Sequence, residues 1–405
     1  MMKQPRKTSP GGAPSGAAAG APNNAPTEQK NPLPDAAPAL QGGQPLSEIA
    51  APLVAWYREH ARPLPWRQQK SAYHVWLSEV MLQQTRIEAV RGYYDRFLAV
   101  APDIPSLAAL SDDRLMKLWE GLGYYSRARN LRRAAVVLCE SYGGEMPRDY
   151  AAIRALPGIG DYTAGAIASI AFGMPSPAPD GNVARVLTRL TGDRADILRQ
   201  DTKKRLRESL VPLYREATAP VTPAALTEGL MELGETVCIP NGTPRCDLCP
   251  LFNLCRARAE GSWGEIPVRQ KKTKRRTVHK LVLLLREEDG RFAIRRRPED
   301  GLLAGLWELP NIDLPERESA EACDALARSF CRENGLRAAE GAVLEDARHI
   351  FTHLEWQMQG YYLNVTYTAP AGETELCFAT PAELHTAYAL PSAFRAFCRV
   401  IFGET

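Results

Sequence analysis

The sequence predicts a protein of two domains, an all-α domain over residues 46–261 followed by a smaller α+β domain over residues 279–405. In the first segment apolar residues recur at intervals of three and four, and Pro, Gly and Asp turns interrupt these runs. After His279 the pattern changes to short strand-like runs, with a hairpin signal at Asp289-Gly290. A chain of 405 residues is long enough to bury a core in each segment.

The flanking segments differ in composition from both domains. Residues 1–45 contain nine prolines and no aromatic residue, so we expect a disordered tail with little apolar surface to bury. Residues 262–278 form a basic connector whose charges face solvent, contact phosphates, or do both. The net charge of only +3 means that any affinity for nucleic acid must come from local clusters.

The chain shows no secretory signal and no apolar run of membrane-spanning length. The five cysteines outside residues 238–255 have no disulfide-framework spacing, which fits a reducing compartment. We therefore expect a cytoplasmic protein, in a bacterial cytosol, that does not associate with membranes.

Four cysteines lie within the eighteen residues 238–255, in a stretch rich in Pro and Gly. Thiolates at this density repel one another unless a metal group binds them, and four thiolates suit a [4Fe–4S] cluster. Tetrahedral zinc is the alternative, but structural zinc sites usually have two Cys-x2–4-Cys knuckles, and only one is present here. The sequence therefore favours a cluster held by Cys238, Cys246, Cys249 and Cys255.

A glycine-rich string at residues 156–165 is typical of a tight turn between two helices. Gly158 and Gly160 would leave backbone N–H groups free at the start of the second helix, where a phosphate can bind. Asp180 follows at a turn that enters an apolar helix, where a simple N-cap is the alternative to a functional acid. In this order, the hairpin, the acid and the four-cysteine loop resemble the helix–hairpin–helix domain of the endonuclease III superfamily.

Residues 76–85 (WLSEVMLQQT) and 121–130 (GLGYYSRARN) narrow the resemblance to MutY-type adenine DNA glycosylases. On a helix, Glu79 shares a face with Trp76 and Leu82, so desolvation would raise its pKa. An exposed Glu on an amphipathic helix is the alternative. The resemblance implies that Glu79 is the catalytic acid that protonates adenine. It also implies that Asp180 stabilises the sugar cation and is held by Asn182 and Tyr162.

The same resemblance implies a set of DNA contacts. Gln84 and Tyr124 would fill or prop open the gap left by the extruded adenine, and Gln83 would lie beside them on the DNA. Arg67 and Glu228 would contact the flipped base. The relevant partner would be duplex DNA containing adenine opposite 8-oxoguanine or guanine.

Two further positions bear on this resemblance. Tyr162 stands where bifunctional members have the Schiff-base lysine, so strand cleavage is expected to be weak or absent. In the second domain, which resembles a Nudix fold, Phe351-Thr352-His353 is similar to the Phe-Ser-His loop that reads 8-oxoguanine. The alternative is that Phe351 is a core residue and His353 a satisfied surface residue. Residues 317–323 lack the second Glu and the Gly of a Nudix metal helix, so pyrophosphatase activity is not expected.

We therefore predict a monomeric, monofunctional adenine DNA glycosylase of base excision repair. Two alternatives remain from the sequence. An endonuclease III-like lyase for oxidised pyrimidines would need an amine in place of Tyr162. A non-catalytic iron–sulfur DNA-binding protein would need neither Glu79 nor Asp180.

Overall fold

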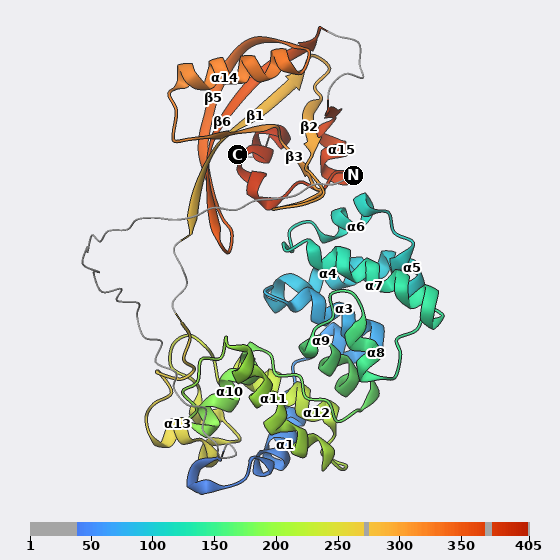
Figure 1. Ribbon diagram of the computed structural model, residues 1–405, viewed down its shortest axis with the longest axis vertical. Coiled ribbons are helices and arrows are strands. Elements are labelled where there is room, and N and C mark those ends of the chain that lie inside the picture. Colours follow the sequence, from blue (N-terminus) through green and yellow to red (C-terminus); the bar gives the residue numbers. More distant parts are fainter. Residues whose placement is uncertain (1–38, 271–274, 369–374, 404–405) are drawn as a thin grey trace, which may run out of the picture. The chain divides into compact units, whose positions relative to one another are not determined.

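The computed structural model describes residues 39–270, 275–368 and 375–403 (Figure 1). Most of the tail expected at residues 1–45 lies outside the described residues, as do Lys271, Lys272 and Lys274 of the basic connector. The described end of the tail is folded: Leu40 is fully buried and residues 41–43 form a 3-10 turn. The ordered chain thus begins earlier than the expected boundary at residue 46, because Leu40 joins an apolar core.

The first domain is all-helical, as the period of its apolar residues predicted. Its helices are α1 (Ala50–His60), α2 (Pro65–Gln68), α3 (Ala72–Leu82), α4 (Ile87–Val100), α5 (Ile104–Ala108), α6 (Asp112–Trp119), α7 (Ser126–Tyr142), α8 (Tyr150–Ala155), α9 (Asp161–Ala166), α10 (Gly181–Thr191), α11 (Gln200–Arg215), α12 (Pro223–Thr236) and α13 (Arg256–Ala259). Helix α9 continues directly into a π-helical turn over Ile167–Ala171.

This domain contains two apolar cores. One lies among α3 to α9 and includes the buried rings of Trp76 and Trp119. The other is formed by α1, α10, α11 and α12 and includes Leu53, Leu190 and Leu230. Helices of both groups line one large open cavity, in which α3 and α9 provide residues from the first group and α10 and α12 from the second. The fold therefore brings together residues that are far apart in the sequence.

Local sequence signals set the helix ends that matter for this cavity. The Ser71 side chain caps α3 by accepting a bond from the His74 N–H, and Asp180 caps α10 by accepting one from the Val183 N–H. At the other end of α10, Gly192 adopts a left-handed conformation (φ 68°) that ends the helix. The start of α10 is thus fixed by the acid that the sequence singled out.

The second domain is built on one mixed sheet with strands β1 (Arg276–Glu287), β2 (Phe292–Arg296), β3 (Trp307–Glu308), β4 (Asn311–Leu314), β5 (Leu336–Ile350), β6 (Leu354–Tyr367) and β7 (Leu376–Ala379). The strand order is β3-β2-β1-β6-β5, with β4 paired to β1 and β7 paired to β2. Strands β1 and β6 are parallel, and β1 and β2 form the antiparallel pair expected from the Asp-Gly turn.

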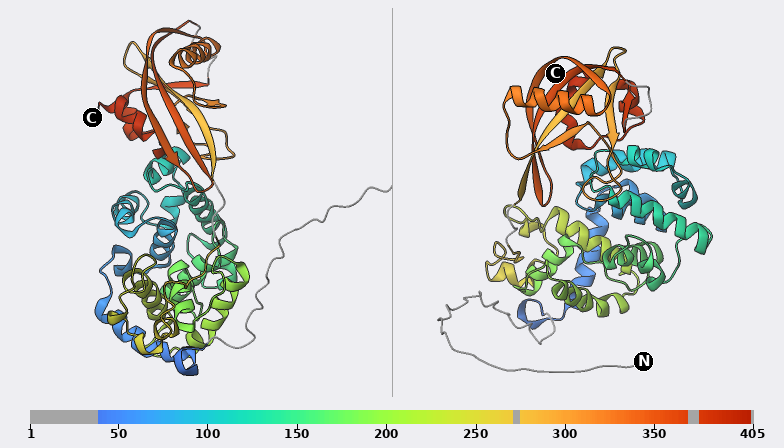
Figure 2. Two further views of the ribbon diagram at one scale, coloured as in Figure 1. Left: turned by 90° about the vertical axis from the view of Figure 1, so that its left-hand side faces the viewer. Right: turned by 45° about the horizontal axis from the view of Figure 1, so that its top comes forward.

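Helices cover both faces of this sheet (Figures 1 and 2). Leu281 and Leu283 of β1 belong to the core beneath α14 (Ala320–Glu333). Val282 and Leu284 belong to the opposite core, beneath α15 (Pro381–Thr386) and α16 (Arg395–Phe402). Burial on both faces explains the unbroken apolar run in β1. Within the described residues of the chain, no helix has the length and apolar character needed to cross a membrane.

Candidate active site and DNA-binding surface

Glu79 of α3 is buried at the cavity, with 6% of its surface exposed. Burial raises the pKa of Glu79 to about 7, although a hydrogen bond from Tyr162 opposes this shift. The Tyr162 hydroxyl of α9 donates to Glu79 Oε2. Tyr162 was expected to hold Asp180, so its observed partner corrects that expectation: α9 packs against α3, and this contact brings the phenol to Glu79.

Asp180 lines the same cavity and is also the N-cap of α10. Its carboxylate accepts a bond from the Val183 N–H at 2.7 Å, so the N-cap interpretation is confirmed, while the functional role of this acid stays a prediction. Burial raises its pKa, while the Val183 bond, the charge of Arg185 and the Asn182 N–H oppose the shift. The Asn182 side chain bonds instead to Arg185 (2.8 Å) and Glu235 (3.2 Å). Asn182 therefore supports Asp180 only through its backbone, because its amide group faces other partners.

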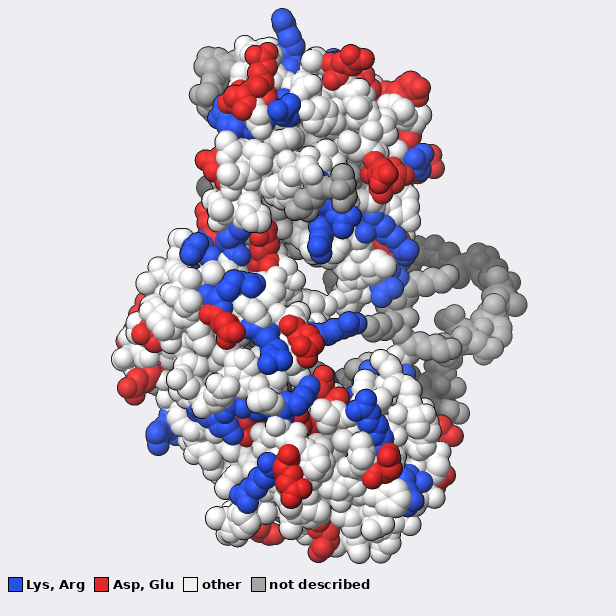
Figure 3. All heavy atoms as spheres, turned by 180° about the vertical axis from the view of Figure 1, so that it is seen from behind, with Lys and Arg blue, Asp and Glu red and all other residues white. Residues whose placement is uncertain are grey.

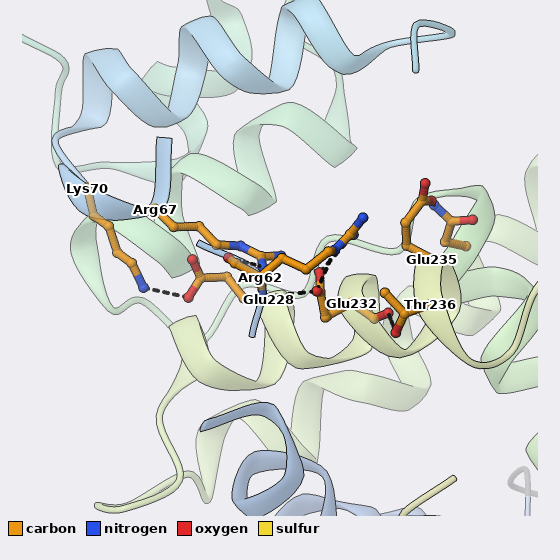
Figure 4. A network of polar contacts seen from close by, with 8 residues as sticks. Arg62, Arg67, Lys70, Glu228, Glu232, Glu235 and Thr236 are labelled. Carbon is orange, nitrogen blue, oxygen red and sulfur yellow. Dashed lines mark hydrogen bonds and ion pairs between the residues drawn. The ribbon is translucent and has the colours of Figure 1, made fainter. Parts of the chain in front are cut away.

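The Glu232 carboxylate of α12 binds two arginines at this cavity (Figure 4). Its side chain is fully buried and accepts bonds from Arg62 Nε at 2.7 Å and from Arg67 Nη2 at 2.8 Å. Burial alone would raise the pKa of Glu232, but these two arginines outweigh it, and the net shift is downward. Glu232 thus fixes the guanidinium of Arg67 beside the cavity.

Glu228 lies one helical turn before Glu232 on α12 and pairs with Lys70 at 2.6 Å (Figure 4). Arg67 and Glu228 were expected from the sequence, whereas Arg62, Lys70 and Glu232 were not. The four-residue spacing of the two glutamates was the only local signal, since it puts both on one face of α12.

The residues expected to enter the DNA lie on two turns. Gln83 and Gln84 follow the end of α3, and Tyr124 precedes α7. Gln84 (φ 60°) and Tyr124 (φ 48°) both adopt left-handed backbone conformations, which non-glycine residues rarely do. Tyr124 is 48% exposed, whereas the Gln83 side chain donates a hydrogen bond to Thr163 Oγ1 at 3.3 Å.

The glycine-rich turn between α8 and α9 also has the expected form. Gly158 has φ 75°, and a Cβ there would lie 2.4 Å from the Cβ of Asn130, so only glycine fits. Gly160 is the N-cap of α9, and a Cβ there would have no atom within 4 Å.

On the face of the molecule shown in Figure 3, basic and acidic side chains are interspersed, in agreement with the small net charge.

The four cysteines of residues 238–255 line one apolar cavity next to α10 and α12. Arg189 of α10 donates to Cys238 Sγ at 3.3 Å. Burial raises the pKa of Cys249 to about 12 and raises the pKa values of Cys246 and Cys255 as well. Because the four sulfurs line one cavity, they could hold a metal group. The positive charge of that group would stabilise the thiolate forms that burial alone disfavours.

In the second domain, residues 351–353 form the turn between β5 and β6. Phe351 is half-buried and packs between His349 (4.6 Å between ring centroids) and Trp356 (4.9 Å). Thr352 and His353 are exposed. The turn thus presents two polar side chains beside an aromatic ring that is held from both sides.

Comparisons with known proteins agree with this architecture. Residues 77–212 match the HhH-GPD superfamily of base excision DNA repair proteins, and residues 281–399 match the NUDIX domain family. These matches confirm the predicted fold of both domains. The chain is 34% identical to the human adenine DNA glycosylase, over 87% of this chain and 73% of that protein.

The adenine DNA glycosylase of Schizosaccharomyces pombe is 30% identical, over 76% of this chain and 80% of that protein. Among solved structures, a thermostable thymine-DNA glycosylase is 26% identical over 53% of this chain and 96% of that chain, with a TM-score of 0.46. The predicted enzyme class, a DNA glycosylase, is confirmed by the relatives and by the superfamily match. The chain belongs to the adenine DNA glycosylase family of base excision repair enzymes.

Proposed function

We propose that this DNA glycosylase hydrolyses the N-glycosidic bond of adenine opposite 8-oxoguanine or guanine in duplex DNA, and leaves the strand uncut. The observation that carries this proposal is the pair Glu79 and Asp180 at one cavity, with the pKa of Glu79 raised to about 7 by burial. A carboxyl group with this pKa can donate a proton at neutral pH and accept one afterwards.

Hydrolysis requires the adenine to leave the base stack, because the glycosidic bond is unreachable inside a duplex. Glu79 then protonates N7 of adenine, which makes the base a leaving group. As the bond breaks, the sugar gains oxocarbenium character, and the Asp180 carboxylate stabilises it. Glu79, now ionised, removes a proton from the attacking water. The bond from Tyr162 to Glu79 Oε2 favours this ionised form and fixes the orientation of the carboxyl group.

Recognition of the extruded base falls to Arg67 and Glu228. Both line the cavity, and each is already held by an ion pair, Arg67 by Glu232 and Glu228 by Lys70. Polar groups that are ordered before the base arrives cost less conformational entropy on binding. These two side chains therefore supply preformed hydrogen-bonding partners for the edge of adenine.

The proposed absence of strand cleavage rests on Tyr162, because a phenol cannot form an imine with the sugar. Lys203 of α11 also lines the cavity, and its amine is the candidate for any residual lyase activity. Product DNA should stay intact until alkali is added, and borohydride should trap little covalent adduct. Efficient trapping would contradict the monofunctional proposal. Its loss in Lys203→Ala would identify Lys203 as the amine responsible.

The turn at residues 351–353 is proposed to distinguish 8-oxoguanine from guanine. Phe351 offers an apolar surface for a base, and the exposed side chains of Thr352 and His353 offer polar atoms for the 8-oxo and N7–H edge.

We further propose that Cys238, Cys246, Cys249 and Cys255 hold a [4Fe–4S] cluster. All four cysteines line one cavity. Only one Cys-x2-Cys pair is present, at Cys246 and Cys249, which favours a four-cysteine cluster over a zinc site with two such pairs. The bound cluster would order the loop and its arginines against DNA phosphates, and hydrolysis would not depend on it. Iron analysis of the purified protein tests this, and one zinc without iron would contradict it.

A release assay on four duplexes tests the proposed function. We expect adenine release from A:8-oxoguanine and A:G, little from A:T, and no release of thymine glycol. Release of thymine glycol with strand cleavage would favour an endonuclease III-like lyase instead. Binding to all four duplexes without any release would favour a non-catalytic DNA-binding protein. We propose that the enzyme acts as a monomer on both A:8-oxoguanine and A:G duplexes. Analytical ultracentrifugation of the protein with and without duplex would test this.

A further inference from the structure

Arg127 joins the two turns that carry Gln84 and Tyr124. It is the second residue of α7, and 9% of its surface is exposed. Its Nη1 donates to the carbonyl oxygens of Val80 (2.7 Å), Met81 (3.0 Å) and Gln83 (2.6 Å) at the end of α3. One guanidinium nitrogen therefore binds three carbonyl groups of the first turn.

The other terminal nitrogen of the same guanidinium binds the second turn. Nη2 donates to the carbonyl oxygens of Leu122 and Gly123, each at 3.0 Å, and to Thr85 Oγ1 at 3.2 Å. The guanidinium carbon lies 5.4 Å from the centroid of the Trp119 ring and 5.6 Å from that of the Tyr124 ring. A single planar group thus holds the backbone of both turns.

The electrostatics of Arg127 are unusual for a side chain with a purely structural role. Burial lowers its pKa to about 10, which still leaves it charged at neutral pH. Among the residues that the structure describes, no carboxylate forms an ion pair with it. Its charge is balanced by carbonyl dipoles, including those at the negative end of α3. Lysine would keep the charge but lacks the planar fork that reaches both turns.

From this geometry we infer that Arg127 is a positioning residue that locks the turns of Gln84 and Tyr124 into one rigid unit, and so determines how fast adenine is extruded. The inference rests on the proposed function. Both residues have left-handed backbones, and such conformations persist only where surrounding contacts hold them. Arg127 supplies those contacts to the residues on either side of Gln84 and to the residue before Tyr124.

The experiment measures extrusion and chemistry separately in the full-length protein. A duplex with 2-aminopurine at the adenine position, opposite 8-oxoguanine, reports unstacking as a rise in fluorescence under saturating enzyme. We expect Arg127→Lys to slow this rise at least tenfold, and single-turnover adenine release to slow with it. Glu79→Gln should lose release but keep a nearly normal rise, because it acts after extrusion. Arg132→Lys, at a half-buried position on the same helix, is the matched control and should change neither rate.

Two further variants separate positioning from general damage to the fold. Thr85→Val removes one acceptor and leaves the guanidinium in place, so we expect a smaller slowing in the same direction with an unchanged Tm. In a Tyr124→Ala background, Arg127→Lys should slow extrusion less than in the wild type, because one of the two side chains that it positions is gone. Damage to the fold alone would lower the amplitude of the rise and leave its rate unchanged, and that result overturns the inference. If the wild type releases no adenine, the proposed function fails instead.

Discussion

The cavity that contains Glu79 and the turn between β5 and β6 present their polar groups in opposite ways. In the cavity, Glu79 and Glu232 are buried carboxylates whose positions are fixed by side chains from other helices. In the turn, Thr352 and His353 are exposed, whereas Phe351 is half-buried and packs against Trp356. The first region can alter pKa values because its carboxyl groups are buried, whereas the second leaves its polar side chains at the surface.

This difference suggests a division of labour. In the proposed mechanism the buried acids act on the bond that breaks, so changes there should affect every mispair equally. Exposed polar groups exchange hydrogen bonds with water for hydrogen bonds with a base edge, so the net gain in binding free energy is small. Changes there should therefore alter the preference among mispairs by modest factors. The predictions below test that division.

The largest effect is expected from Glu79→Gln. An amide cannot donate the proton to adenine, so single-turnover release should fall at least ~10²-fold on both A:8-oxoguanine and A:G, with duplex binding retained. Glu88→Gln, at an exposed position on α4, is the control and should leave the rate unchanged. Near-normal release by Glu79→Gln would remove this residue from the mechanism.

The pH dependence should follow the raised pKa of Glu79. Release requires its protonated form, so the single-turnover rate should fall about tenfold per pH unit above about pH 7. The rate should also fall in acid, where Asp180 becomes protonated, at a pH above the usual range for an aspartate because burial raises its pKa. Equal profiles for A:8-oxoguanine and A:G are expected. A flat profile between pH 7 and 9 would contradict the assignment.

The same shift predicts a cost in stability. The folded-state pKa of Glu79 lies above its unfolded value of 4.5, so its favourable contribution is complete below about pH 4.5 and lost as pH rises to about 7. Glu79→Gln should therefore be more stable than the wild type at pH 8, by roughly 1–3 kcal/mol. Urea unfolding at pH 8 and pH 5 measures this. A gain of the same size at both pH values would mean that burial of the charge is not the cause.

Glu232→Gln tests the positioning of Arg67. A neutral amide leaves Arg62 and Arg67 without their shared charge, so release should fall roughly tenfold on both mispairs and the Tm should drop. Glu208→Gln, which removes an exposed partner of Lys204, is the matched control. A loss confined to A:8-oxoguanine would break the proposed division of labour.

Much of this cavity was predictable because its main acids lie in short local patterns. Glu79 sits in a helical string and Asp180 precedes an apolar helix, and the resemblance of these strings to the MutY-type family singled out both acids. The partners were not predictable in the same way. Tyr162 reaches Glu79 because α9 packs on α3, and Arg62 meets Glu232 across 170 residues of sequence. Such pairs depend on tertiary packing, which local sequence patterns do not show. For this reason the expected partner of Tyr162 was Asp180 instead of Glu79, and Glu232 was not predicted at all.

The smallest expected effect comes from the exposed turn and is the sharpest test of the comparison. His353→Ala removes an exposed side chain that is not part of the core, so we expect unchanged folding and nearly unchanged release from A:G. The preference for A:8-oxoguanine over A:G should fall roughly fivefold, the equivalent of ~1 kcal/mol for one base-edge contact. Val343→Ala, at an exposed position on β5, controls for changes in the domain surface and should leave the preference intact. Single-turnover release from both duplexes gives the ratio directly. Equal losses on the two substrates would mean that the turn contributes general DNA affinity, and that reading of 8-oxoguanine lies elsewhere in the molecule.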